Sequence, residues 1–409
     1  MLLSIWLCLH SGDATALILG SAILPPPRRL GATLFHAPRS QPCFDCNVVL
    51  ISIDTLRADH LGCYGYPRNT SPSIDEFSSE SVRFATTITH ATSTLRSHAS
   101  ILTSLLPFQH RAIRSKDSPL PPEALTLAEI LRDRGYETAA FTGGGQMDPV
   151  YGLDQGFNSY VSEPASPLPA NVDKAISWLD KNRGKNFFLF LHTYEVHAPY
   201  EPQKRFLDLF EENNHSSLPR NISADLIRQI NLKLFGVSAV NREDIQRIVN
   251  AYDAEIRSVD EAFARFKHYL QDSGLYDRLL IVFLADHGED FGEHGTVGMH
   301  PQSLYDEVLK VPLIIKFPGS AHAAEVIEDQ VRTIDVLPTI LETLGIDSDG
   351  PFQGISLLEW IEGRRKEGLF AFSQRGTLTA PSISIRTQRW KLYDGRLYDL
   401  ALDPRERRD

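Results

Sequence analysis

Residues 47–66 read NVVLISIDTLRADHLGCYGY, and this stretch is the strongest indicator of the fold in the sequence. The run 48–53 is apolar apart from one serine, has the length of a strand and ends on Asp54. Short apolar runs bounded by polar residues are typical of strands that are buried in an α/β sheet. Ligands collect at the carboxyl ends of such strands, so Asp54 lies where a functional carboxylate is expected.

A second stretch, residues 279–290, repeats this pattern as LLIVFLADHGED. Its apolar run ends on Asp286 and His287, an adjacent carboxylate and imidazole. Carboxylates and imidazole are ligands of divalent metals, so these two residues and Asp54 predict a metal site. A Thr/Ser/His cluster lies between the two stretches, and one of its hydroxyls is a candidate nucleophile.

The composition bounds the class of protein. The chain has 409 residues, 42% of them apolar and 23% charged, which is typical of one large globular domain with an appendage or of two domains. The net charge of −11 argues against nucleic-acid binding, which needs a basic face. It leaves an anionic substrate possible, because a metal and a few cations can reverse the potential inside a pocket.

Strand and helix patterns alternate along most of the chain, which predicts the α/β class with a large central sheet, mostly parallel or mixed, and helices on both faces. We expect three parts: a leader and linker in 1–46, a catalytic domain in 47–345, and a small antiparallel C-terminal subdomain in 346–409. The expected strands of the main sheet are 48–53, 139–142, 187–192, 279–285 and 312–317. The expected helices are 97–105, 125–134, 170–181, 242–272 and 333–344, with Asn241 as the N-cap of the fourth.

The first 46 residues carry two ambiguous signals. MLLSIWLCLH is apolar but has no basic residue before it and is too short to span a bilayer, so a degenerate export signal, a wrongly assigned start and a disordered arm all stay open. No later segment reads as a transmembrane helix. Cys43 and Cys46 have CxxC spacing without a second such pair, which favours two thiols or a local disulfide over structural zinc.

Ten motifs in order resemble the sulfatase family of the alkaline phosphatase superfamily, over nearly the whole chain from about Asn47. They are ISIDTLRADHLGCYGY, SHASILTSLLP, TLAEILRDRGYETAAF, YGLDQGFNSY, FFLFLHTYEVHAPYEP, YDAEIRSVDEAF, LADHGEDFGEHG, SLYDEVLKVPLIIKFPG, TIDVLPTILETLG and RWKLYDGRLYDLALDP. The resemblance implies an alkaline phosphatase-like fold, the hydrolysis of an anionic ester and, as a habit of the family, export to a secreted or periplasmic location.

The resemblance places the family's nucleophile motif, Cys/Ser-x-Pro-x-Arg, on residues 94–98, which read TLRSH. The family's cysteine or serine is oxidised to formylglycine, but threonine cannot become that aldehyde, so we expect no formylglycine at Thr94. A threonine hydroxyl is a usable nucleophile when a metal lowers its pKa. Thr94 is therefore the expected nucleophile, and a helix cap is the structural alternative. Arg96 and His98 are candidate ligands of the substrate anion. The alternatives are a surface arginine for Arg96 and, for His98, a contact with Thr94 or a satisfied place in the core.

Two histidines match further catalytic positions of the family. His197 matches the residue that contacts the bridging ester oxygen, and His300 matches the residue that binds the anion. The chain also differs from the family pattern at two places. Thr55 replaces the second aspartate of the metal site, and residues 141–145, FTGGG, replace a GKWH-like run that supplies two cations.

The predicted function is therefore a metal-dependent hydrolase of sulfate, phosphate or phosphonate esters. Asp54, Asp286 and His287 would hold a divalent metal ion, which an imidazole in the ligand set shifts from calcium toward manganese or zinc. The expected partner is a small-molecule or glycan anionic ester, with no nucleic acid and no stable membrane span; the sequence does not reveal the oligomeric state. A phospho- or sulfo-group transferase and a non-catalytic sulfatase-like binding protein are the alternatives.

Overall fold

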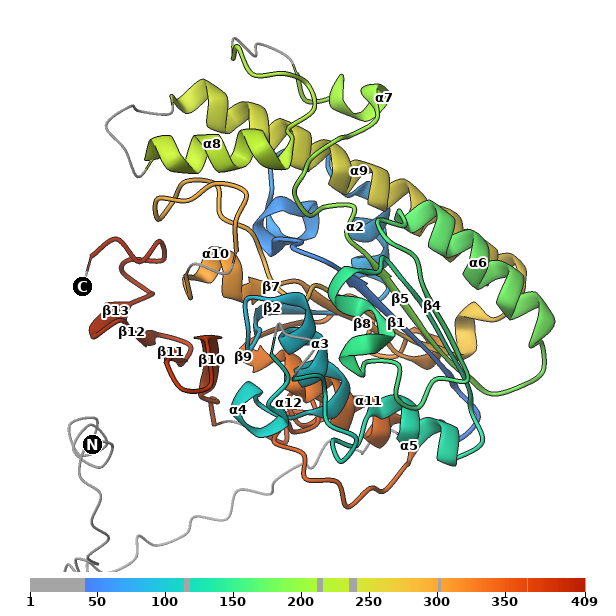
Figure 1. Ribbon diagram of the computed structural model, residues 1–409. Helices are drawn as coiled ribbons and strands as arrows, with labels where there is room; N and C mark the ends of the chain where they lie inside the picture. The colour runs from blue at the N-terminus through green and yellow to red at the C-terminus, as the bar shows by residue number, and fades with distance from the viewer. Residues whose placement is uncertain are drawn as a thin grey trace, which may run out of the picture. The chain divides into compact units, whose positions relative to one another are not determined.

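The computed structural model describes residues 41–113, 118–211, 216–234, 241–300, 303–365 and 367–408. These residues form two sheets with helices around the larger one (Figure 1). Nearly all of the predicted leader and linker lies outside the described residues. Among the helices that are described, none combines the length and the apolarity that a membrane crossing requires.

The larger sheet carries the metal-site candidates. Its strands lie in the order β4 (Ser159–Ser162), β3 (Glu137–Thr142), β5 (Phe187–Thr193), β1 (Asn47–Ile53), β6 (Leu279–Leu284), β8 (Leu313–Lys316), β2 (Val82–Ile88) and β7 (Lys310–Val311), and β9 (Val326–Arg332) pairs with β2. The five strands from β4 to β6 are mutually parallel, whereas β8 runs antiparallel to both β6 and β2. The predicted mixed α/β sheet is confirmed.

Eleven α-helices are assigned within the described residues. They are α2 (Pro72–Ser79), α3 (Thr94–Thr103), α4 (Pro107–His110), α5 (Leu127–Asp133), α6 (Leu168–Lys181), α7 (Lys204–Leu207), α8 (Ala224–Leu234), α9 (Arg242–Asp272), α10 (Asp306–Leu309), α11 (Val336–Leu344) and α12 (Leu358–Ile361). The bounds of α9 agree with the prediction, and the Asn241 side chain accepts a hydrogen bond from the Asp244 N–H, as an N-cap does.

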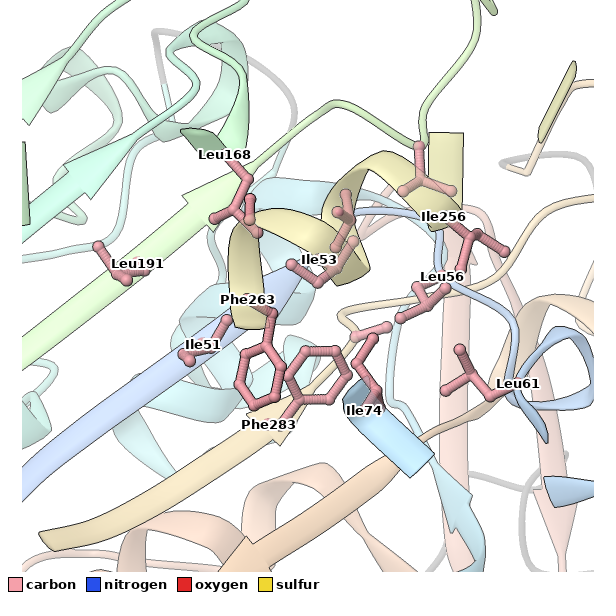
Figure 2. Packing of buried hydrophobic residues seen from close by; sticks show 14 of the residues in the cluster. Ile51, Ile53, Leu56, Leu61, Ile74, Leu168, Leu191, Ile256, Phe263 and Phe283 are labelled. Carbon is pink, nitrogen blue, oxygen red and sulfur yellow. The ribbon is translucent and has the colours of Figure 1, made fainter. Parts of the chain in front are cut away.

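The central strand β1 divides the core into two layers, because successive side chains on a strand point to opposite faces. Val49, Ile51 and Ile53 pack with residues of α2, α6 and α9. Val48 and Leu50 pack with residues of α3, α5, α11 and α12 on the other face (Figure 1). Figure 2 shows the first layer, where Phe263 of α9 contacts Phe283 of β6 edge to face at 5.4 Å between ring centroids.

The sequence did not predict β2 and β9, two paired strands of the larger sheet. The β2 sequence, VRFATTI, mixes apolar residues with one arginine and two threonines, so no apolar run marks it. Its partners β8 and β9 lie more than 200 residues further along the chain. The pairing is therefore set by tertiary contacts, which a local pattern does not contain.

The smaller sheet is antiparallel, in the order β10 (Ala371–Gly376), β11 (Pro381–Arg386), β12 (Trp390–Tyr393) and β13 (Arg396–Asp399), as predicted for the C-terminal part. Buried ion pairs fasten it to α10, since Arg386 and Lys391 both contact the Asp306 carboxylate, at 2.8 and 2.9 Å. Cys43 and Cys46 form a disulfide, which resolves the alternatives left open by their spacing.

Candidate functional site

The predicted metal ligands converge at the carboxyl ends of β1 and β6. These strands are parallel neighbours with Ser52 opposite Leu284, so Asp54 and Asp286 follow at matching positions. Both carboxylates and the His287 ring are fully buried, and one donor atom from each lies within 4.8 Å of the others.

Three atoms of this cluster lack hydrogen-bond partners among the described residues: Asp54 Oδ1, Asp286 Oδ2 and His287 Nε2. Buried polar atoms are nearly always satisfied, and leaving one unpaired costs about 1–3 kcal/mol. The second nitrogen of His287 bonds with the Gly288 carbonyl oxygen at 3.1 Å, which is the usual outer partner of a metal-bound histidine. The residues therefore fit a divalent metal ion.

The electrostatics of the cluster agree with this interpretation. Burial raises the pKa of Asp286 well above its usual value, and the charge of Asp54 raises it further. Burial also acts to raise the pKa of Asp54, but the His192 hydrogen bond and the neighbouring imidazoles outweigh it and lower that pKa. The His287 pKa lies well below its usual value, through burial and the charge of His300. Two buried carboxylates beside a neutral imidazole leave a deficit of positive charge that a cation would fill.

Thr94 lies in the first turn of α3, three residues earlier than the sequence predicted for the start of this helix. Its hydroxyl is buried and donates a hydrogen bond of 3.0 Å to Asp54 Oδ2. The Gln146 side-chain oxygen accepts from the Leu95 N–H at 3.3 Å and so caps the same helix end. Thr94 is thus joined to the carboxylate cluster, and the N-cap position of α3 belongs to Ser93.

His98 links the backbone of Thr94 to strand β1. Its Nδ1 donates to the Thr94 carbonyl oxygen at 2.8 Å, and its Nε2 bonds with the Ser52 hydroxyl of β1 at 2.9 Å. Burial lowers the pKa of His98 to about 3, so the ring is neutral and Nε2 accepts the Ser52 proton. Both nitrogens are occupied within the protein, and neither is left for a substrate anion.

Arg96 lies on another side of α3, because two helical steps of about 100° separate it from Thr94. Its guanidinium is near His110, whose pKa it lowers, and makes no ion pair within the described part of the chain. The structure therefore brings together the predicted metal ligands and Thr94 but places Arg96 outside their cluster.

His197 and His300 complete a row of imidazoles with His287. The His300 ring stacks on His287 at 4.3 Å and meets His197 edge to face at 4.9 Å, both between ring centroids. Although burial lowers the pKa of His300, the Glu289 carboxylate, 3.5 Å away, raises it above its usual value on balance. His197 Nδ1 donates to the Ala198 carbonyl oxygen, so its Nε2 is the atom free to meet a ligand.

Thr55, which replaces the family's second aspartate, does not turn its hydroxyl toward the metal-site atoms. The hydroxyl donates to the carbonyl oxygens of Asp54 and Val196 at 2.7 and 3.0 Å. Its φ of 57° is the left-handed region, which a β-branched residue rarely adopts. The Tyr252 hydroxyl holds this turn by donating to the Thr55 carbonyl oxygen at 2.8 Å, and the Thr55 N–H donates to Asp286 Oδ1 at 3.3 Å.

Tyr194 is a site residue that the sequence motifs did not single out. Burial raises its pKa well above the usual value and the Asp54 charge adds to this, while a hydrogen bond with the Thr94 side chain lowers it. The phenol oxygen accepts from the Gln146 N–H at 3.0 Å, so its proton is available to a second partner.

Two glycines of the FTGGG run, Gly143 and Gly145, make room for this ring. A Cβ on Gly143 would lie 2.8 Å from Tyr194 Cδ2, and one on Gly145 would lie 3.1 Å from the phenol oxygen. The triple glycine itself was the available signal, since it indicates a close approach of another group. A neutral phenol thus lies against the glycines that stand where the resemblance implied two cations.

Comparisons with known proteins identify the family. A family model described as Sulfatase matches residues 46–346, and one described as N-sulphoglucosamine sulphohydrolase, C-terminal, matches residues 292–409. The chain belongs to the sulfatase family, within the alkaline phosphatase superfamily, and is a sulfatase-like ester hydrolase. The resemblance predicted from the motifs is confirmed at this level; the replacement of formylglycine by threonine stays a prediction.

Several relatives match over most of their length. The chain is 24% identical to the multifunctional alkaline phosphatase superfamily protein PehA of Trinickia caryophylli, with 78% of this chain and 77% of that protein covered. It is 24% identical to an arylsulfatase of Clostridium perfringens, with 78% and 79% covered. Among solved structures, the phosphonate monoester hydrolase of Agrobacterium radiobacter shares the fold, with a TM-score of 0.73, 23% identity and 88% and 90% coverage.

A further structure, determined in complex with its substrate D-glucosamine-2-N,6-O-disulfate, has a TM-score of 0.74 to this chain at 20% identity. The match covers 89% of this chain and 93% of that one. At this identity the likeness establishes the shared fold and leaves the substrate open.

The environment of His110, a buried histidine next to Arg96, leads to a prediction about the stability of the protein in acid. Burial, aided by the Arg96 charge, lowers the pKa of His110 from 6.5 to about 3. As the pH falls below 6.5, the unfolded chain binds a proton at this residue and the folded chain does not, so stability is lost on acidification. This should remove about 2 kcal/mol of unfolding free energy between pH 7.5 and pH 5.

Denaturant unfolding of the wild type and of His110→Gln at both pH values measures this contribution. The fall in unfolding free energy should be smaller by about 2 kcal/mol in His110→Gln. His268→Gln is the matched control, because His268 is exposed on α9 and should change the pH dependence little. Equal pH dependence in wild type and His110→Gln would contradict the prediction.

Proposed function

We propose that this sulfatase-family enzyme hydrolyses its anionic ester with the Thr94 hydroxyl as the nucleophile and with a divalent metal ion as cofactor. One observation carries the proposal: the Thr94 hydroxyl lies 3.0 Å from Asp54 Oδ2, in a cluster whose Asp54 Oδ1, Asp286 Oδ2 and His287 Nε2 make no hydrogen bond among the described residues. A nucleophile and its activating group within hydrogen-bond reach are the expected arrangement.

Asp54, Asp286 and His287 would hold the metal ion. Two carboxylates and one imidazole suit manganese or zinc, and calcium remains compatible if further oxygen ligands join. When bound, the ion supplies positive charge that favours an ionised hydroxyl and stabilises charge on the reacting ester. The Thr55 hydroxyl is committed to two backbone carbonyls, so the ligand set has one carboxylate fewer than the resemblance implies.

Thr94 is held for attack in the absence of substrate. The hydroxyl proton points at Asp54 Oδ2, which leaves the oxygen lone pairs directed elsewhere. His98 fixes the Thr94 backbone to β1 through Ser52, and this restricts the rotation of the first helical turn. Such preorganisation lowers the entropy cost of the attack. His98 is therefore assigned to positioning, and a direct role of Arg96 in anion binding has no support from its place on α3.

His300 and His197 would act on opposite ends of the ester. His300, whose pKa is raised by Glu289, can carry a positive charge and bind a non-bridging oxygen of the anion. His197 Nε2 can donate a proton to the bridging oxygen as the leaving group departs. Because Nδ1 already donates to the Ala198 carbonyl, this donation requires the doubly protonated ring.

Tyr194 would be a further donor to the anion. Its raised pKa keeps the phenol protonated, and the oxygen accepts from the Gln146 N–H, so the phenol proton can be donated to a substrate oxygen. A neutral donor in place of two cations suits an ester with a single negative charge. This favours sulfate monoesters, phosphodiesters or phosphonate monoesters over dianionic phosphate monoesters.

Two alternatives remain for comparison. In a transferase, the group carried by Thr94 would pass to an alcohol and not to water. In a non-catalytic binding protein, the site would hold an ester without cleaving it. The matches to hydrolases and the intact Asp54, Asp286, His287 and His197 support hydrolysis. Relatives that act on sulfated sugars make a sulfated or phosphorylated glycan one reasonable substrate class.

The nucleophile is tested by Thr94→Ala and Thr94→Ser. Loss of the hydroxyl should lower kcat by about 10³-fold or more, because nucleophile and cofactor act as a unit, whereas serine should retain measurable turnover. Bound metal and melting temperature should stay near wild type in both variants. Near-normal turnover of Thr94→Ala would show that water attacks directly, and peptide mass spectrometry should find unmodified threonine at residue 94.

The role of Tyr194 is tested by Tyr194→Phe. Removal of one donor to the developing charge should lower kcat by about 10²-fold with a small change in KM. Tyr136→Phe is the matched control, since that buried hydroxyl donates to the Cys46 carbonyl away from the site and should leave kcat unchanged. A Tyr194→Phe enzyme with normal kcat and a lowered melting temperature would reduce Tyr194 to a structural role.

The reaction class is tested with two esters of one phenol, a phosphonate monoester and a sulfate monoester, which carry the same single charge. A formylglycine enzyme releases sulfate by collapse of a hemiacetal, a route that Thr94 lacks. A phosphonyl group on Thr94 is removed by in-line attack of water, which positioned charge assists. We therefore expect the phosphonate to have the higher kcat/KM, and a clear preference for sulfate would contradict the threonine mechanism.

A further inference from the structure

A second group of carboxylates lies in the loop after β6, apart from the residues assigned to the reaction. Asp290, Glu293 and Glu307 each offer one oxygen, and these oxygens lie within 4.8 Å of one another. Asp290 is fully buried, and the Glu307 side chain is only 8% exposed. Asp290 and Glu293 belong to the segment between β6 and His300, whereas Glu307 belongs to α10.

Two of the three carboxylates have an unsatisfied oxygen, whereas both oxygens of Glu293 accept hydrogen bonds, one from Arg57 and one from the Phe291 N–H. Asp290 Oδ1 and Glu307 Oε1 have no hydrogen-bond partner among the described residues, although the other oxygen of Asp290 accepts from the Thr296 hydroxyl at 2.6 Å. His294 Nε2 is also unpartnered in that part of the chain and lies 3.3 Å from Glu307 Oε1. A buried carboxylate oxygen without a donor is costly, so it points to a ligand that supplies positive charge.

The protein itself supplies too little positive charge at this place. Arg57 donates to Glu293 Oε1 at 2.7 Å, but the same guanidinium also donates to both oxygens of Asp59 and to the Glu289 carbonyl. Its donors are therefore divided among acceptors that belong to Asp59, Glu289 and Glu293. In the absence of a further cation, burial and the neighbouring carboxylates raise the pKa of Asp290 to about 7 and that of Glu307 to about 9.

We propose that Asp290, Glu293 and Glu307 bind a second divalent cation, for which calcium is the best match because the three side chains are oxygen donors. Access from solvent is available on the Glu293 side, where that residue lines a surface pocket with Arg57, Asp59 and Gly292. This inference does not depend on the mechanism at Thr94 or on occupancy of the first metal site.

The second cation site would join two segments that support the first metal site: the loop after β6 and α10. Gly288 donates through its N–H to the Val308 carbonyl at 2.8 Å, and a Cβ on Gly288 would lie 2.0 Å from the Glu307 carbonyl oxygen, so loop and α10 already touch. A cation held by Asp290 and Glu307 adds a second link between them. The loop continues to His300, and α10 carries Asp306, which binds the C-terminal sheet. The cation would thus stabilise the position of His300.

The test counts bound ions in the full-length protein. Wild type, Glu307→Gln and the exposed-carboxylate control Glu328→Gln are stripped with chelator, equilibrated with calcium alone, and analysed for calcium per chain together with the calcium-induced rise in melting temperature. Glu307→Gln should hold one ion fewer than wild type and lose most of the rise, whereas Glu328→Gln should match wild type in both.

Asp286→Asn separates the two sites, because it removes a ligand of the first and none of the second. It should still bind one calcium per chain, and Asp286→Asn with Glu307→Gln should bind none. Equal calcium content in wild type and Glu307→Gln would overturn the proposal, and the carboxyl groups would then hold protons instead. Binding of manganese without binding of calcium would also overturn it, and would bring His294 into the ligand set.

Discussion

The parallel register of β1 against β6 is the constraint from which the geometry of the site follows. It sets Ser52 opposite Leu284 and so brings two carboxylates, Asp54 and Asp286, to one edge of the sheet in a fully buried place. Carboxylates this close in a low dielectric repel one another unless positive charge or protons compensate them. This pair is contacted by the neighbouring imidazoles, by the turn at Thr55 and by the hydroxyl of Thr94.

The helix that carries the nucleophile is attached to the sheet by side chains and not only by apolar packing. His98 joins the Thr94 carbonyl to Ser52, and the Ser97 hydroxyl donates to the Asp286 carbonyl oxygen at 2.5 Å. Ser52 can serve this purpose because the alternation along β1 turns it to the same face as Val48 and Leu50, toward α3. The position of Thr94 relative to Asp54 is therefore fixed from two strands.

The C-terminal sheet contributes to the same arrangement from outside. The Ser373 hydroxyl of β10 donates to the Thr89 carbonyl oxygen at 2.6 Å, and the Gln374 N–H donates to the His90 carbonyl oxygen at 2.9 Å. Residues 89–93 connect β2 to α3, so these bonds hold the segment that leads to Thr94. Together with the ion pairs of Asp306, these bonds show that the smaller sheet helps to hold the site residues in place.

Strong local signals in the sequence were enough to predict several elements and the residues at their ends. The apolar runs predicted β1 and β6, the apolar stripe and Asn241 predicted α9, and the strand-end positions singled out Asp54, Asp286 and His287. These signals can be read from the sequence because strand and helix periods, caps and chain order are local properties. The motif order added the sulfatase family, which the family match confirms.

The tertiary structure was needed to show which residues meet. Some of these arrangements join residues that are distant in sequence: the pairing of β2 with β8 and β9, the place of Tyr194 beside Thr94 and against Gly143 and Gly145, and the second carboxylate group. Others depend on which way a side chain faces: Arg96 is buried near His110 and away from the carboxylate cluster, and both nitrogens of His98 are occupied within the protein. Long-range strand order and side-chain direction follow from packing the whole core at once, and no local period encodes them.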